Sequence, residues 1–198
     1  MTPRTAELER NTCETSIRVR VDLDAAAAEP KVATGIGFLD HLLTALAFHA
    51  GIGLELDARG DLEVDDHHTA EDCGLALGEA IDRALGERRG IVRFGWAYAP
   101  LDEALARAVV DLSGRPASKV SLDLCREQLG TLSTENVSHV VASLATALRA
   151  AIHVDVLRGD NDHHRAEAAF KALALALRQA LALRDGERPA VPSTKGAL

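Results

Sequence analysis

The stretch DDHHTAED at residues 65–72 reappears as NDHHRAEA at residues 161–168. Both copies contain His-His-x-x-Glu, and both open a segment whose apolar residues recur at helical spacing. Upstream of each copy another histidine, His41 or His139, begins a further helix-like segment. These matching features, in the same order, indicate one structural unit that was duplicated and fused.

The repeat extends to an acidic residue near a predicted strand. Glu14 precedes RVRVDL and Glu103 precedes ARAVVDL, each at the same distance from the Asp of a Val-Asp-Leu. A period of about 95 residues is too long for a solenoid and fits two half-domains related by a pseudo-two-fold axis. We expect a first half at residues 1–92, a second half at 93–184 and an extended C-terminal arm at 185–198.

Hydrophobic periodicity predicts the elements of each half. Residues 15–23, TSIRVRVDL, alternate polar and apolar side chains, as a half-buried strand does. The pattern further predicts strands at 52–60, 93–99, 104–112, 118–124 and 152–157, and helices at 39–51, 67–86, 134–151 and 163–184. The expected fold class is α+β, in which each half is a small mixed sheet packed on two helices and the helices form the shared core.

Composition excludes several classes of function. The chain has 198 residues, a formal net charge of −8 and 3% aromatic residues, so it lacks the basic surface and the stacking platforms of a nucleic-acid binder. Its apolar runs stay below the roughly 20 residues that span a bilayer. The three cysteines, Cys13, Cys73 and Cys125, are odd in number and widely spaced, which disfavours a disulfide framework and a thiolate zinc site. We expect a cytoplasmic globular protein.

The histidines indicate a metal centre. Adjacent residues on a helix diverge by about 100°, so the two imidazoles of a pair suit different ions better than one ion. Two pairs, two glutamates and two upstream histidines would then give three nitrogens and one carboxylate to each of two ions. Imidazole and carboxylate without thiolate fit Mn(II), Fe(II), Ni(II) or Zn(II), and residue type does not choose among these metals. The predicted ligands are His41, His67, His68, Glu71, His139, His163, His164 and Glu167.

Two other classes of protein share this kind of ligand set. A dinuclear metallohydrolase would activate water between two close ions. A metal store built as a four-helix carboxylate bundle would use Glu-x-x-His, the reverse of the order in this chain. The repeat also makes Glu14 and Glu103 candidates to face the site, whereas His153 has no duplicated partner and is expected to be an ordinary surface or core residue.

Motifs along almost the whole chain resemble the imidazoleglycerol-phosphate dehydratases, enzymes of histidine biosynthesis. They include RNTCET, TGIGFLDH, DDHHTAED, LGERRGIVRFG, PLDEALA, VDLSGRP, TEN, GDNDHHRAEAAFKA and the terminal PSTKG. The resemblance implies two Mn(II) ions per active site, held by the same eight residues. It also implies a homo-oligomer of 24 subunits built from trimers, with sites completed by neighbouring chains.

The resemblance implies further site residues. Those that match the family's substrate- and phosphate-binding groups are Arg93, Asp102, Arg115, Lys171, Ser193 and Lys195. Those expected to take part in catalysis are Glu14, His49, Glu71 and Glu167. The chain has Ala45 where many members have Gln, and Phe48 where many have a basic residue, so its substrate contacts along the helix at 39–51 are expected to differ.

The activity so implied is dehydration of imidazoleglycerol phosphate to imidazole acetol phosphate. The proton to be removed lies on a carbinol carbon without an adjacent carbonyl, so a carboxylate alone could not remove it near neutral pH. A metal-bound imidazolate could expel the neighbouring hydroxyl and acidify that C–H bond. We favour Glu14 as the carboxylate that takes the proton. The basic groups would mainly orient the phosphate.

Overall fold

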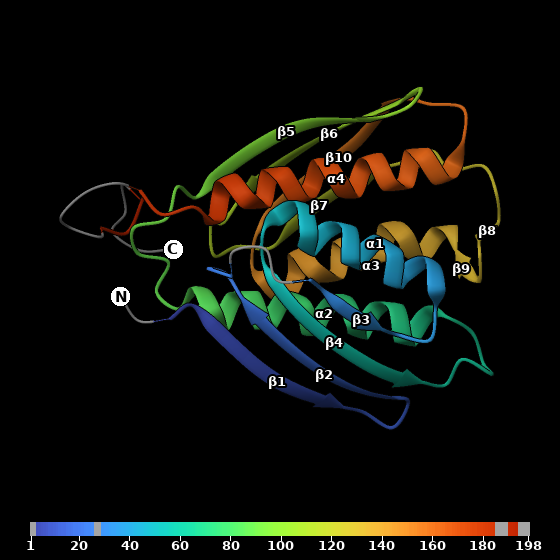
Figure 1. Cartoon of the computed structure of the whole chain (residues 1–198), viewed down its shortest axis with the longest axis horizontal. Helices are drawn as coiled ribbons and strands as arrows, with labels where there is room; N and C mark the ends of the chain where they lie inside the picture. Colours follow the sequence, from blue (N-terminus) through green and yellow to red (C-terminus); the bar gives the residue numbers. More distant parts are fainter. Residues whose placement is uncertain (1–2, 26–28, 185–189, 194–198) are drawn as a thin grey trace.

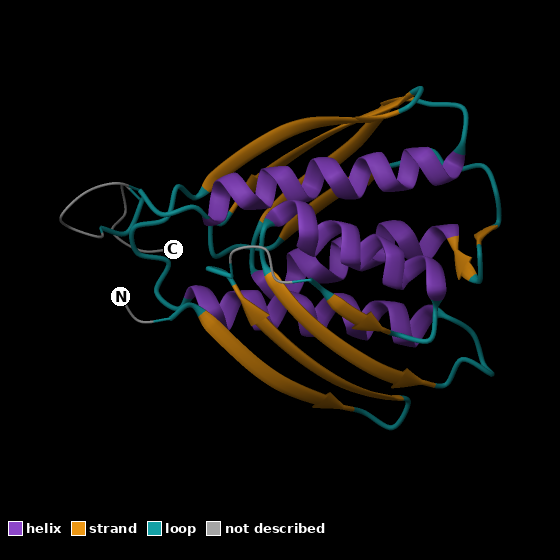
Figure 2. Ribbon diagram, viewed as in Figure 1, coloured by secondary structure: helices purple, strands orange, loops and turns teal. Residues whose placement is uncertain are grey.

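Two four-stranded sheets enclose four helices in the computed structural model, which describes residues 3–25, 29–184 and 190–193 (Figures 1 and 2). The first sheet contains β1 (Thr5–Asn11), β2 (Thr15–Asp22), β3 (Lys31–Ala33) and β4 (Gly53–Gly60). The second contains β5 (Phe94–Leu101), β6 (Ala104–Asp111), β7 (Ala117–Ser121) and β10 (Ala151–Arg158). The helices are α1 (Gly37–Ala50), α2 (His67–Leu85), α3 (Thr134–Leu148) and α4 (Asp162–Leu181), and a short hairpin of β8 (Gln128–Leu129) and β9 (Leu132–Ser133) precedes α3.

The two sheets have the same topology. Their strand orders are β1-β2-β4-β3 and β5-β6-β10-β7, and in each the last pair is parallel while the other pairs are antiparallel. This match confirms the predicted α+β class with two similar halves. The helices pair across the halves, because α1 packs against α4 and α2 packs against α3. The shared helical core is therefore made of contacts between the two copies.

Alternation of side chains explains the strands. In β2 the side chains of Ile17, Val19 and Val21 are buried, while those of the intervening polar residues are exposed. Burial of these apolar side chains against α2 stabilises the layer. Strands β1 and β3 are absent from the prediction, because β1 buries only Leu8 among charged neighbours and β3 has three residues. The helix predicted to reach residue 151 ends at Leu148, since Arg149 adopts a left-handed backbone with φ 54°.

All four helices begin at the same end of the molecule (Figure 1, right), where the hairpins β1–β2 and β5–β6 also turn. The loop before β5 and the described part of the C-terminal segment lie at the opposite end (Figure 1, left). Within the described residues, none of the helices combines the length and apolar character that a bilayer-spanning segment needs.

Candidate metal centre

One cluster of ligands joins α1 to α4. His41 Nε2 lies 3.0 Å and His163 Nε2 lies 3.2 Å from the same carboxylate atom, Glu167 Oε2. Lys171 Nζ lies 2.7 Å from the other oxygen of Glu167. Burial works to raise the pKa of Glu167, but Lys171 and His41 outweigh it and lower this pKa to about 2. The carboxylate is therefore ionised and the two imidazoles converge on it.

A second cluster joins α2 to α3. The rings of His67 and His139 stack with centroids 4.8 Å apart, and His139 Nε2 lies 3.3 Å from Glu71 Oε1. Asn136 Oδ1 accepts a 3.0 Å hydrogen bond from His67 Nδ1, which leaves the Nε2 lone pair of that ring available. His139 Nε2 is buried and has no hydrogen-bond partner among the described residues. A buried ring nitrogen that makes no hydrogen bond, beside a carboxylate, is a position that a cation would satisfy.

The remaining two predicted ligands point away from these clusters. His68 Nδ1 lies 3.0 Å from Asp61 Oδ2, and His164 Nδ1 lies 2.8 Å from Glu103 Oε2. The adjacent histidines of each pair thus diverge, as helix geometry predicts. The predicted ligand set of three nitrogens and one carboxylate per ion is not met within one chain. Each cluster contains only two nitrogens and one carboxylate.

His164 also lies in a group with two acidic side chains. Asp102 Oδ2 is 3.8 Å from its Nε2, whereas Glu103 contacts its Nδ1. The hydrogen bond from His164, followed by the backbone N–H of Asn161, lowers the pKa of Glu103 to about 2. The same pairing raises the pKa of His164, and the hydrogen bond to Asp61 raises the pKa of His68.

Both clusters fit a divalent cation by donor chemistry. Each offers imidazole nitrogen and carboxylate oxygen at short mutual distance, without sulfur, which suits Mn(II), Fe(II), Ni(II) or Zn(II). Three donors leave coordination positions for further ligands and a substrate. The clusters also occupy equivalent positions in the two halves, since a histidine of one half meets a His and a Glu of the other.

The two remaining predicted catalytic residues lie in the β1–β2 hairpin and on α1. Glu14, in the β1–β2 hairpin, is half exposed, and its Oε2 is 3.9 Å from His68 Nδ1. His49, in the last turn of α1, is half-buried. Burial is the largest cause that lowers its pKa, and the positive charge of Lys171 lowers it further. The lowered pKa favours the neutral form of the His49 imidazole.

Most of the predicted phosphate-binding residues lie at the other end of the molecule. The helix α4 carries the chain about 20 Å from Glu167 to Ala180, whose carbonyl accepts a hydrogen bond from the Arg93 N–H. The Arg93 guanidinium contacts both carboxylate oxygens of Asp111, at 2.6 and 3.0 Å, and donates to the Pro192 carbonyl. Arg115 and Ser193 are also described, while Lys195 and the arm segments 185–189 and 194–198 lie outside the described residues.

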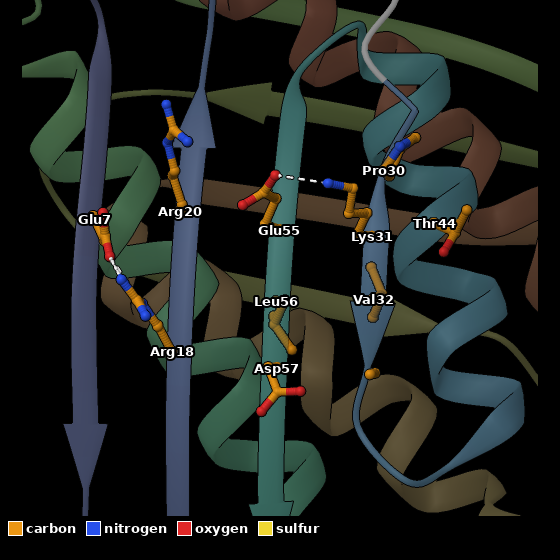
Figure 3. A pocket seen from close by; sticks show the side chains of 11 residues that line it. Glu7, Arg18, Arg20, Pro30, Lys31, Val32, Thr44, Glu55, Leu56 and Asp57 are labelled. Atoms are coloured by element: carbon orange, nitrogen blue, oxygen red, sulfur yellow. Dashed lines mark hydrogen bonds and ion pairs between the residues drawn. The ribbon is translucent and has the colours of Figure 1, made fainter.

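Two hollows on the surface differ in their lining. One of about 710 Å³ is lined by His41, His163, Phe38 and the backbone of nearby glycines, so it opens beside the first cluster. The other, of about 620 Å³, lies over the first sheet between charged side chains such as Arg20 and Glu55 (Figure 3). That second hollow contains none of the predicted site residues.

The positions that depart from the family pattern lie on α1. Phe48 is 66% exposed and its ring packs edge-on against His49, while Ala45 is half-buried. Two residues that hold the site histidines, Asp61 and Asn136, were not predicted from the sequence. Asp61 belongs to an Arg-Gly-Asp that recurs before α4 at residues 158–160, and Asn136 stands in the quoted TEN motif. Both signals were present, although neither residue belongs to the repeated His-His-x-x-Glu pattern.

Comparison with known proteins gives one consistent result. The family model described as imidazoleglycerol-phosphate dehydratase matches residues 34–177. A Neurospora crassa protein named imidazoleglycerol-phosphate dehydratase is 53% identical over 99% of this chain and 96% of its own length. A Phytophthora nicotianae protein of the same name is 57% identical over 98% of this chain, which spans 42% of that longer protein. The crystal structure of imidazoleglycerol-phosphate dehydratase from Staphylococcus aureus superposes with a TM-score of 0.82 at 36% identity, covering 91% of this chain and 99% of the other.

Proposed function

The chain belongs to the imidazoleglycerol-phosphate dehydratase family of hydro-lyases in histidine biosynthesis, and from that premise we propose a metal-dependent mechanism for it. In this proposal two divalent cations, Mn(II) in the working enzyme, serve each active site. The substrate is imidazoleglycerol phosphate and the product is imidazole acetol phosphate. The observation that carries the proposal is the pair of equivalent His–His–Glu clusters, His41–His163–Glu167 and His67–His139–Glu71.

A bound divalent cation supplies Lewis acidity that favours the deprotonated form of an azole ring. The chain's own residues do the rest. Glu14 is the base that takes the proton from the carbinol carbon, because it is an accessible carboxylate next to a predicted ligand histidine. The lowered pKa of His49 favours its neutral imidazole, which can accept and return a proton near Lys171. Asp102, 3.8 Å from His164 Nε2, lies where it can orient a substrate hydroxyl.

Binding of the phosphate falls to the basic groups. Arg93 and Arg115 offer planar guanidinium groups suited to phosphate oxygens, and Ser193 and Lys195 add a hydroxyl and an ammonium from the C-terminal segment. Lys171 lies next to Glu167, on the metal side. Because Arg93 contacts the far end of α4, about 20 Å from Glu167, a substrate that touches both a cluster and Arg93 requires residues from more than one chain.

We therefore also propose assembly into 24 subunits built from trimers. Two features support it. Each cluster lacks a third imidazole, while His68 and His164 point away from their own chain's clusters and can reach a neighbour's. The outer face of the second sheet exposes Phe94, Trp96 and Tyr98, the kind of large apolar patch that marks an interface.

The test is reconstitution of a metal-free preparation. Protein stripped with a chelator and dialysed should lose dehydration of imidazoleglycerol phosphate, and Mn(II) should restore it with two ions bound per chain. Adding other divalent ions one at a time ranks the metals by the dehydration activity that each restores. Full activity in the stripped protein would overturn metal dependence. Hydrolysis of simple phosphoesters without dehydration would favour the dinuclear hydrolase instead.

A further inference from the structure

The duplicated carboxylates Glu14 and Glu103 have different surroundings. They occupy equivalent hairpins, β1–β2 and β5–β6, and each lies near the second histidine of its His-His pair. Glu103 Oε2 accepts a 2.8 Å hydrogen bond from His164 Nδ1, and its Oε1 accepts from the backbone N–H groups of Asp160 and Asn161. Glu14 makes no hydrogen bond to His68, from which it is separated by 3.9 Å. One copy is thus engaged with its histidine and the other is available.

A different carboxylate holds His68. Asp61 Oδ2 lies 3.0 Å from His68 Nδ1, in the position that Glu103 occupies relative to His164. Asp61 follows β4 in an Arg-Gly-Asp whose duplicate ends in Asp160. The connection from Gly60 to α2 spans residues 61–66, whereas that from Gly159 to α4 spans only 160–161. The longer first connection brings an aspartate side chain to the ring, while the shorter second one presents backbone N–H groups to Glu103.

We propose that Glu103 and Asp61 are positioning residues for the two outward histidines, and that Asp61 frees Glu14 for proton transfer. This inference rests on the proposed function, in which His164 and His68 bind metal. An ionised carboxylate only accepts hydrogen bonds, so each partner histidine carries its proton on Nδ1. In the neutral ring the lone pair is then on Nε2, the nitrogen left to bind a cation. Such outer carboxylates fix the tautomer and the ring orientation of metal-binding histidines.

The matched pair Glu103→Gln and Glu14→Gln makes the same chemical change at the two duplicated positions. In Glu103→Gln the amide oxygen can still accept hydrogen bonds from the Asp160 and Asn161 N–H groups. The amide nitrogen, however, would donate to His164 Nδ1, and this favours the tautomer with the proton on Nε2. We expect Glu103→Gln to weaken Mn(II) binding by about 10- to 100-fold, with turnover recovered at high Mn(II). Glu14→Gln should keep Mn(II) affinity and lose turnover. Free Mn(II), counted by electron paramagnetic resonance during titration of the metal-free protein, measures the affinity.

A second variant keeps the test decisive. The Asp61 carboxylate accepts no hydrogen bond from a backbone N–H of the described residues, so Asp61→Asn should leave the fold intact. It should weaken Mn(II) binding as Glu103→Gln does. If Glu103→Gln does not fold, Asp61→Asn alone tests the proposal. Wild-type Mn(II) affinity in Asp61→Asn or folded Glu103→Gln would overturn the proposal, as would equal weakening by Glu14→Gln. If the wild-type protein bound Mn(II) but did not dehydrate the substrate, the proposed function would be contradicted. The Mn(II) affinities of the variants would still test the roles of Glu103 and Asp61.

Discussion

The hydroxyl of Thr15 donates a 2.5 Å hydrogen bond to Oδ2 of Asp72, a buried carboxylate on α2. The other oxygen of Asp72 accepts from Arg10 Nε at 2.8 Å. Thr15 and Arg10 are in the two strands of the hairpin that carries Glu14, so this contact fixes the hairpin to the helix that begins with His67 and His68. The position of the proposed base relative to the ligands therefore depends on Asp72.

Replacing Asp72 with Ala should loosen this hairpin. The variant removes the acceptor of two hydrogen bonds and leaves Arg10 without its ion pair, at a cost of about 2 kcal/mol in the free energy of unfolding. Urea denaturation of the metal-free protein measures the cost, and turnover should fall because Glu14 is less well placed. Thr15→Ser keeps a hydroxyl and is the control. If Thr15→Ser lowered the free energy of unfolding as much as Asp72→Ala does, the threonine methyl, and not the hydrogen bond to Asp72, would be what stabilises this contact.

The crossed pairing of the two halves makes a prediction about metal counts. Because His41 and His163 serve one cluster, replacing either with Asn should reduce bound Mn(II) from two ions per chain to one, and the double variant should still hold one. Combining His41→Asn with His139→Asn removes one ligand from each cluster and should abolish both ions. Metal analysis after gel filtration distinguishes these cases. Two ions lost in the His41–His163 double variant would contradict the pairing.

The sequence predicts the residues of the clusters better than their pairing. The repeat selects His41 and His139 together with the two His-His-x-x-Glu motifs, and the structure places six of these eight residues in the two clusters. Spacing along the chain could not show that His41 joins Glu167 of the opposite half, because a pseudo-two-fold axis allows either half to complete the other. Contacts between α1 and α4 decide this, and such contacts leave no mark in a single sequence.

The elements were predicted where burial is periodic. The helix α1 and the strand β2 have one apolar face each, so their patterns are clear. Strand β3 is short and lies at a sheet edge, where few side chains are buried and the pattern is weak. The hydrogen bonds of Arg93 to Asp111 and Pro192 could likewise not be foreseen, because they depend on how the chain end returns to the loop before β5.

Cys73 should be inert in the native protein. Burial among apolar side chains is the largest cause that raises the pKa of its thiol to about 12, so almost no thiolate exists at pH 8. Cys13 and Cys125 are exposed and should react with Ellman's reagent within minutes. The expected titration is two fast thiols in buffer and a third only in denaturant. Three fast thiols in the native protein would contradict the burial of Cys73 between α2 and its neighbours.

Gly78 sets the distance between the helices of the second cluster. A Cβ at this position would lie 2.6 Å from the Leu144 carbonyl oxygen and 2.9 Å from the Leu148 nitrogen, both in the backbone of the α3 region. Gly78→Ala must therefore push α3 away from α2, and overpacking of this kind costs about 1–3 kcal/mol.

The displacement should also be visible in the metal count. Movement of α3 carries His139 away from Glu71 and His67, so the variant should bind one Mn(II) more weakly and keep the ion at His41, His163 and Glu167. Gly37→Ala is the control for stability, because a Cβ added at this position of α1 would meet nothing described within 4 Å and Ala favours a helix. Calorimetry and Mn(II) titration measure the two effects together. A Gly78→Ala protein with wild-type stability and two tight ions would mean that α2 and α3 do not control this cluster.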